Sequence, residues 1–189
     1  MSDAWCAAMP ASVEDARQAV VGVLPATVSE GVTVDRAIGR ISAASVTASS
    51  PWPALDRARV DGVAVRAADT AGACEARPLV LVVAGESGPG EPAGRLSAGM
   101  GWRVRTGAAM PVGADAVVPV EDLRDEGERA LLARRVVAGS GVEPAGNDVP
   151  AGAPLLEPGE LRTPRRAALV AAMGSVSVQV SRRPRVAIL

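Results

Sequence analysis

Glycine and proline are spaced so closely between residues 51 and 141 that only short strands fit between them. The run Ser49-Ser50-Pro51-Trp52-Pro53 breaks any regular element, because each proline biases the residue before it toward extended geometry. The run Gly139-Ser140-Gly141 ends the stretch. The breaks separate five strand-like segments: 62–66, 79–84, 102–105, 115–120 and 130–137. This pattern predicts a small barrel or sandwich, with 85–101 as a mobile loop or a long hairpin connection.

A helix is expected over 12–24, ahead of this stretch. Ser12 can cap its first turn, Glu14 and Asp15 suit the positive end of the helix dipole, and Pro25 ends it. The apolar residues of one face would be Val13, Ala16, Val20 and Leu24.

The remaining signals lie on both sides of the strand-rich stretch. Gly31 predicts a turn, and 33–46 mixes the start of an apolar strand with a short helical patch at 34–38. Thr163 followed by Pro164 predicts a capped helix start, and Gly174 suits the C-terminal cap. The expected apolar face of this second helix is Ala168, Leu169, Ala172 and Met173.

Two extended segments are expected at the end of the chain. Valine alternates with polar residues over 176–180, which predicts a half-buried strand. The run 186–189 is uninterruptedly apolar and is typical of the buried first strand of a parallel sheet. Because such a strand needs neighbours on both sides, the pattern indicates that 183–189 opens a further domain.

Composition excludes several classes of function. The 189 residues contain no histidine, and all 20 basic residues are arginine, so a Ser-His-Asp triad, an imidazole metal site and a lysine phosphate cradle are excluded. A net charge of −1 gives no general attraction to nucleic acid. Cys6 and Cys74 lie too far apart for a CxxC motif and are expected to be reduced thiols. No signal peptide or membrane-spanning run is present, so we expect a cytoplasmic protein without a membrane partner.

The segment 106–118 is the part of the chain most like a functional loop. Gly107 and Gly113 permit backbone angles that other residues avoid, and small side chains let a ligand approach the main chain. Such a loop can present Thr106, Asp115 and backbone amides together. The alternative is a tight connection between two strands.

Five motifs in order resemble the MoeA family, the molybdopterin molybdenumtransferases, to which the E domain of gephyrin is related. Segment 35–41 resembles the family's ALGRVLA, 60–69 its MDGYAVRAAD, and 106–118 its TGAPLPEGADAVV. Segment 146–149 is similar to GEDI, and 161–189 to the helix, strand and RPRVAIL that lead into the molybdopterin-binding domain. The resemblance covers about 11–189.

The resemblance implies a mixed α and β fold of two domains. An elongated α/β domain used in dimerisation would be formed by 1–50 and 142–182, a β-rich, barrel-like domain by the inserted 51–141, and 183–189 would begin the molybdopterin-binding domain. It also implies a homodimer whose cleft is shared with that third domain of the other subunit. The implied reaction takes adenylylated molybdopterin and molybdate, with Mg²⁺, and yields molybdenum cofactor and AMP.

The resemblance also assigns site residues. Asp61, Thr106 and Asp148 are the expected catalytic positions, with Asp61 and Asp148 as ligands for Mg²⁺ or molybdate. The expected cofactor-binding residues are Gly107, Ala108 and Asp115. Carboxylates suit this chemistry because Mg²⁺ prefers hard oxygen ligands and screens phosphate charge.

The residues themselves allow plainer roles. Asp61-Gly62 is also a hairpin-turn pair, Thr106 can bond to a local amide, and Asp148 can cap a turn before Pro150.

The chain departs from the family pattern at two places. In the segment 56–64, Asp-Arg-Ala-Arg-Val-Asp-Gly-Val-Ala stands where the family carries DNSAMDGYA, and Val63 replaces the tyrosine. Segment 142–145 lacks the family's arginines and contains Glu143, while Arg57 and Arg59 offer compensating charge. These departures point to an incomplete or diverged member, and the alternative function is a dimerising scaffold or binding module without chemistry.

Overall fold

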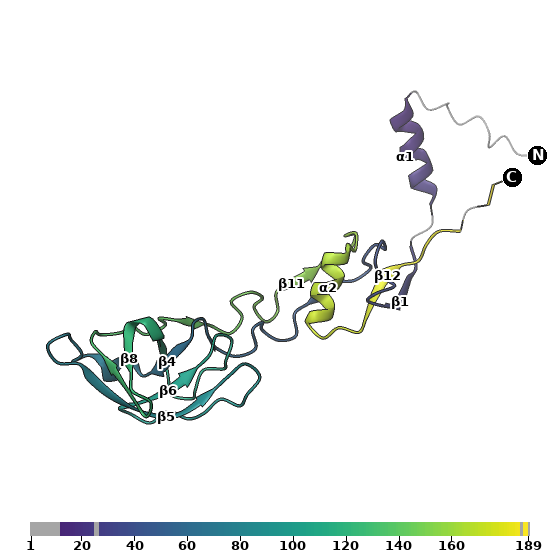
Figure 1. The fold of residues 1–189 in the computed structure, drawn as a ribbon. Coiled ribbons are helices and arrows are strands. Elements are labelled where there is room, and N and C mark those ends of the chain that lie inside the picture. Colours follow the sequence, from purple (N-terminus) through teal and green to yellow (C-terminus); the bar gives the residue numbers. More distant parts are fainter. Residues whose placement is uncertain (1–11, 25–26, 186, 189) are drawn as a thin grey trace, which may run out of the picture.

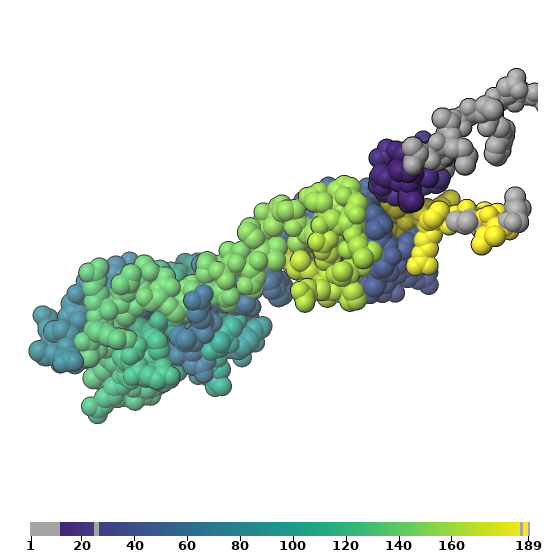
Figure 2. Space-filling model, turned by 90° about the horizontal axis from the view of Figure 1, so that it is seen from above, coloured from purple at the N-terminus to yellow at the C-terminus, as the bar shows by residue number. Residues whose placement is uncertain are grey.

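The computed structural model describes residues 12–24, 27–185 and 187–188. The molecule is elongated, with a curled six-stranded sheet at one end and a smaller region of helix and short strands toward the other (Figure 1). Two segments of chain join these parts, one before and one after the sheet. The molecule narrows where they run (Figure 2). The fold is therefore mixed α and β, as expected.

The sheet contains every strand that the sequence predicts between 51 and 141. Its spatial order is β7 (Ala116–Pro119), β4 (Gly62–Val65), β6 (Met100–Val104), β5 (Leu79–Ser87), β9 (Arg129–Leu132) and β8 (Leu123–Asp125). The predicted strand 130–137 ends early, at Leu132, because the pairing of β9 with β5 and β8 stops at that residue. Two short 3-10 helices, η1 (Ala67–Thr70) and η2 (Val120–Asp122), follow β4 and β7.

The prediction of a loop over 85–101 is confirmed for 88–99, which contain no helix or strand of the sheet, and the alternative of a hairpin is wrong. Gly85 belongs to β5 and Gly101 to β6, and these strands run parallel, with Ser87 opposite Val104. A hairpin joins only antiparallel strands. A Cβ atom on Gly85 or Gly94 would lie 2.5 or 2.2 Å from the ring of Trp102. These glycines therefore make room for the indole.

Both faces of the sheet are buried at β4. Along β4, Val63 and Val65 join one core and Ala64 joins the other, as the alternation of side chains in a strand requires. The first core also contains Ala67, Ala73, Leu81, Ala116, Val118, Ala130 and Leu132. The second contains Ala58, Val104, Ala108, Met110 and Val117.

A third core lies in the region of short strands. There β1 (Ser29–Thr33) pairs with β12 (Ser177–Ser181), and β2 (Val46–Thr47) pairs with β11 (Pro154–Leu156). The helix α2 (Pro164–Ala172) packs on β11. The buried residues are Val34, Ala37, Ala48, Leu155, Leu156, Ala167, Val170, Met173, Val178 and Val180. They come from two separate parts of the chain, which lie on either side of the six-stranded sheet in the sequence.

Both predicted helices are present, but their apolar faces differ from expectation. The helix α1 (Val13–Val23) is capped by the Ser12 hydroxyl, which accepts from the Asp15 amide at 3.1 Å, yet none of its residues is buried. In α2, the cap at Thr163 and the positive φ of 84° at Gly174 agree with the prediction. The buried face of α2 is Ala167, Val170 and Met173, whereas Ala168, Leu169 and Ala172 are exposed.

Three further expectations need correction. Gly31 is not in a turn: it lies within β1 opposite Gln179, where a Cβ atom would contact the Gln179 amide nitrogen at 3.3 Å. The helical patch at 34–38 is a turn held by the Ala37 amide bonding to the carbonyl of Thr33, and it does not extend into a helix. The predicted strand at 176–180 is β12, which begins one residue later.

The predicted strand at 186–189 falls partly outside the described residues, which exclude Val186 and Leu189. Ala187 and Ile188 lie in no strand, and both are exposed. Cys6 also lies outside the described residues, and Cys74 is a free, exposed thiol. No helix within the described ranges is both long enough and apolar enough to cross a bilayer.

Candidate functional site

Asp61 and Thr106 meet at one edge of the sheet. Asp61 precedes β4 and Thr106 follows β6, and these strands are antiparallel neighbours with Gly62 opposite Val104. The backbone amide and the hydroxyl of Thr106 both donate to Asp61 Oδ1, each at 2.7 Å. The alternative role of Thr106, bonding to a local amide, is therefore wrong. The hairpin role of Asp61-Gly62 is also wrong, because β4 pairs with β6 and β7 and not with the preceding strand β3 (Arg57–Ala58).

These contacts hold Asp61 in its ionised form. The Thr106 amide, followed by the Thr106 hydroxyl and the nearby positive charge of Arg105, lowers the pKa of Asp61 below its usual value. The carboxylate is exposed at the protein surface. Asp61 therefore presents a fixed negative charge to whatever approaches this edge.

The loop after Thr106 is pinned to β3. The amide of Gly107, whose φ is 87°, donates to the carbonyl of Ala58, and the Ala58 amide donates to the carbonyl of Ala108, each at 2.8 Å. The Ala108 amide donates to the Arg105 carbonyl, and the residue is fully buried. The amides of Gly107 and Ala108, two of the three predicted cofactor-binding residues, thus bond within the chain, and their contact with a cofactor stays a prediction.

Asp115 is engaged elsewhere in the fold. Its Oδ1 accepts from the amide of Ala67 at 2.7 Å, at the start of η1. Its own amide donates to the carbonyl of Val65. This geometry gives Asp115 a role in holding η1 against β7 and does not bring it to Asp61.

Asp148 lies in a separate cluster around Arg57. Arg57 on β3 stands opposite Glu143 on β10 (Val142–Glu143), and Arg57 Nε donates to Glu143 Oε2 at 2.6 Å. Arg57 Nη2 is 3.9 Å from Asp148 Oδ2. The bond between Arg57 and Glu143 raises the pKa of the arginine and lowers that of the glutamate. No side-chain cap from Asp148 to the turn before Pro150 is present among the described contacts.

This cluster connects one residue from each of the two departures from the family pattern, Arg57 and Glu143. Arg57 and Glu143 were each conspicuous in the sequence, but their pairing depends on the register of β3 against β10. The structure shows that the charges at the two positions neutralise one another. Arg57 is therefore not a free cation beside Asp61.

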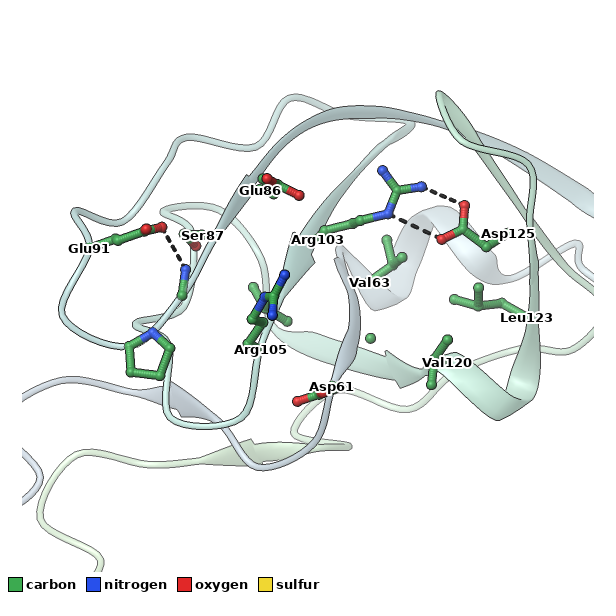
Figure 3. Close-up of a pocket in the computed structure, with 14 residues that line it drawn as sticks. Asp61, Val63, Glu86, Ser87, Glu91, Arg103, Arg105, Val120, Leu123 and Asp125 are labelled. Atoms are coloured by element: carbon green, nitrogen blue, oxygen red, sulfur yellow. Dashed lines mark hydrogen bonds and ion pairs between the residues drawn. The ribbon is translucent and has the colours of Figure 1, made fainter.

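A cavity of about 510 Å³ adjoins Asp61 (Figure 3). Val63, Val120 and Leu123 contribute to its apolar lining. The charged side chains that line it are Asp61, Glu86, Glu91, Arg103, Arg105 and Asp125. Arg103 is bonded to Asp125 through Nε at 3.2 Å. Apart from Asp61, sequence reasoning missed these lining residues, because most of them lie on β4, β5, β6, η2 and β8, which come together only in the folded sheet.

The site around Asp61 offers few protein ligands for a magnesium ion. No group of three or more potential ligand side chains lies together within the described residues. Mg²⁺ commonly binds through one or two carboxylates, with waters and substrate phosphates completing its shell. Asp61 fits such a partial set. Asp148 lies 3.9 Å from Arg57 Nη2 in the other cluster, and its role as a metal ligand stays a prediction.

The family model described as MoeA N-terminal region (domain I and II) matches residues 11–174. The chain belongs to the MoeA family. Molybdopterin molybdenumtransferase 2 of Mycobacterium tuberculosis is 33% identical over 183 residues, covering 94% of this chain and 44% of the relative. Molybdopterin molybdenumtransferase of Bacillus subtilis is 35% identical, covering 95% of this chain and 43% of the relative.

A solved structure agrees with these sequence matches. The molybdopterin biosynthesis MoeA protein from Pyrococcus horikoshii superposes with a TM-score of 0.85 at 35% identity, covering 90% of this chain and 44% of that one. The curled sheet and small helices are therefore those of a MoeA protein. The chain spans less than half the length of these relatives.

Proposed function

We propose that this chain serves molybdenum cofactor biosynthesis at the molybdate-insertion step, as an incomplete or diverged MoeA protein. The relatives are named as molybdopterin molybdenumtransferases. The proposed substrates are adenylylated molybdopterin and molybdate, with Mg²⁺ as the metal ion. The observation that carries the proposal is the Asp61 carboxylate, fixed by two bonds from Thr106 beside a cavity of substrate size.

The chain's own residues would bind and orient the substrate. Thr106 occupies Oδ1 of Asp61 and thereby sets the orientation of the whole carboxylate. Arg105 lines the same cavity and can pair with an anionic group. When bound, Mg²⁺ would supply neutralising charge on a phosphate, and Asp61 would be its ligand from this chain.

The division of the chain and its assembly are part of the same proposal. We place the dimerising domain at 1–50 and 142–182, the inserted β-rich domain at 51–141, and the start of a molybdopterin-binding domain at 183–189. The clustering of buried residues into cores on either side of positions 49–53 supports the first boundary. We also propose a cytoplasmic homodimer, in which the exposed apolar side chains Val20, Val23 and Leu169 become covered.

The second candidate is a dimerising scaffold without chemistry. It is favoured by the pairing of Arg57 with Glu143, which neutralises one of the two arginines that offered compensating charge near Asp148.

A chimaera tests the choice between these functions. The corresponding N-terminal region of the Bacillus subtilis relative is replaced by this chain, and molybdenum cofactor formation is measured in a host that lacks its own enzyme. We expect restored formation, a loss of about tenfold or more with Asp61→Asn, and no loss with the exposed control Glu75→Gln. A folded, dimeric chimaera that forms no cofactor would establish the scaffold instead.

A further inference from the structure

A second cavity, of about 650 Å³, lies beside the β1–β12 pair, away from the six-stranded sheet. Three arginines line it, Arg40, Arg182 and Arg183, and no aspartate or glutamate does. The other polar lining residues include Ser29, Ser42 and Ser181. Within the described residues, the wall of this cavity is therefore cationic. In Figure 1 it belongs to the region where β1 and β12 lie side by side.

One carboxylate serves two of these arginines. Glu30 pairs with Arg40, and its other oxygen is 3.7 Å from Arg182 Nε. Arg40 Nη2 also donates to the carbonyl of Ser181 at 2.8 Å, which fixes its position. None of the ion pairs found within the described ranges involves Arg183. The three arginines thus carry more positive charge than Glu30 neutralises.

A fourth arginine, Arg162, contacts the cavity lining through Ser42 without lining the cavity itself. Arg162 is 1% exposed, and its Nη2 donates to Ser42 Oγ at 3.0 Å. Its Nε and Nη1 atoms are buried without a hydrogen-bond partner in the part of the chain that the structure describes. Burial lowers the pKa of Arg162. A buried guanidinium without a counter-ion is costly, and the charge of Arg162 adds to the positive potential near Ser42, which lines the cavity.

Two other acidic side chains, Glu157 and Glu160, do not neutralise the cavity either. Glu157 and Glu160 flank the turn at Pro158 and Gly159, which lines the cavity, but neither of them lines it. Glu160 is held by Arg166 at 2.9 Å and by the amide of Glu157 at 2.9 Å. The cavity therefore retains its positive charge.

We propose that this cavity binds the phosphate group of a small-molecule ligand. Guanidinium groups offer paired N–H donors that match phosphate oxygens, and the hydroxyls of Ser29 and Ser181, which line the cavity, can donate further bonds. The volume falls in the range of small-molecule sites. The site is separate from Asp61, and the inference does not depend on the proposed function.

The test titrates the 189-residue protein with inorganic pyrophosphate at constant ionic strength, by calorimetry and by amide NMR. We expect saturable binding, with the largest shifts at Ser42, Ser181 and Arg183. Arg183→Gln should weaken binding about tenfold, the loss expected for one charge-assisted hydrogen bond. The control Arg165→Gln makes the same charge change at an exposed position on α2 that does not line the cavity, and should leave the affinity within twofold.

Several outcomes would overturn the proposal. Equal weakening by Arg183→Gln and Arg165→Gln would show general charge attraction. An absence of saturable binding up to roughly 10 mM, the weakest affinity of interest, would show that no site exists. Citrate binding more tightly than pyrophosphate would assign the cavity to carboxylates. Because Arg183 is exposed, its replacement is expected to leave the thermal unfolding midpoint unchanged, which keeps the comparison valid.

Discussion

Replacing Gly62 by alanine is expected to destabilise the six-stranded sheet by about 2–4 kcal/mol. A Cβ atom at this position would lie 2.0 Å from the Val118 carbonyl oxygen and 2.9 Å from its carbon. The first distance is about 1.3 Å shorter than an ordinary C···O contact of about 3.3 Å. The obstacle is backbone of β7, which no change of side-chain rotamer can move away.

The magnitude combines two costs. Overpacking typically costs about 1–3 kcal/mol, and a shift of β4 away from β7 would weaken at least one ladder hydrogen bond, worth about 1 kcal/mol. Gly62 is bracketed by both neighbours, opposite Val104 on β6 and Pro119 on β7. A shift of β4 that relieves the clash with β7 would therefore press β4 against β6.

Urea unfolding monitored by tryptophan fluorescence would measure the effect, since Trp102 lies on β6 in the same sheet. The matched control is Gly72→Ala, because a Cβ atom on Gly72 meets nothing within 4 Å and its φ is not positive. We expect that control to match the original protein or exceed its stability by up to about 1 kcal/mol. If Gly62→Ala unfolds within about 0.5 kcal/mol of the control, the steric argument is refuted.

Three other perturbations give distinct outcomes. Thr106→Val should raise the pKa of Asp61 toward its ordinary value, which carboxyl NMR can follow. Because the pKa of Asp61 is lowered in the folded state, the stability that Asp61 contributes is present above its unfolded-state pKa and is lost as the pH falls through its folded-state pKa. The variant should therefore lose less stability on acidification. Leu156→Ala, at a side chain only 1% exposed, should cost about 2–5 kcal/mol in urea unfolding, whereas Leu161→Ala, 52% exposed, should stay within about 0.5 kcal/mol. Leu169→Glu should shift the proposed homodimer toward monomer or aggregate in sedimentation, and a stable monomer of the unmodified chain across micromolar concentrations would contradict the dimer.

Local signals predicted the elements better than their contacts. The ends of α2 follow from chemistry that acts within a few residues, through Thr163, Pro164 and Gly174. Its buried face could not be chosen in the same way, because 167–173 is apolar on every side of the helix. Packing on β11 selects the face that contains Val170.

The strands show the same division. Their positions follow from β-branched runs between glycines and prolines. The parallel direction of β5 and β6 instead depends on the path of the chain that connects them, which packs against Trp102 through Gly94. Asp61 and Thr106 were both predicted as site residues, and the register of β4 against β6 brings them together. The pairing of Arg57 with Glu143 required the register of two strands that are far apart in sequence. The proposed domain boundaries stay a prediction.

Ala48 and Ala153 are joined by a backbone hydrogen bond, with the whole six-stranded sheet between them in the chain. During synthesis, Ala48 and the earlier core residues Val34 and Ala37 therefore emerge long before Leu155 and Val180, their partners in the core. Closing so long a loop from an unfolded chain carries an entropic cost. Once β3 has paired with β10, the chain segments that enter and leave the six-stranded sheet are already adjacent, and only short segments remain to be ordered. We therefore expect the sheet to form first and the smaller core to assemble in the last step of folding.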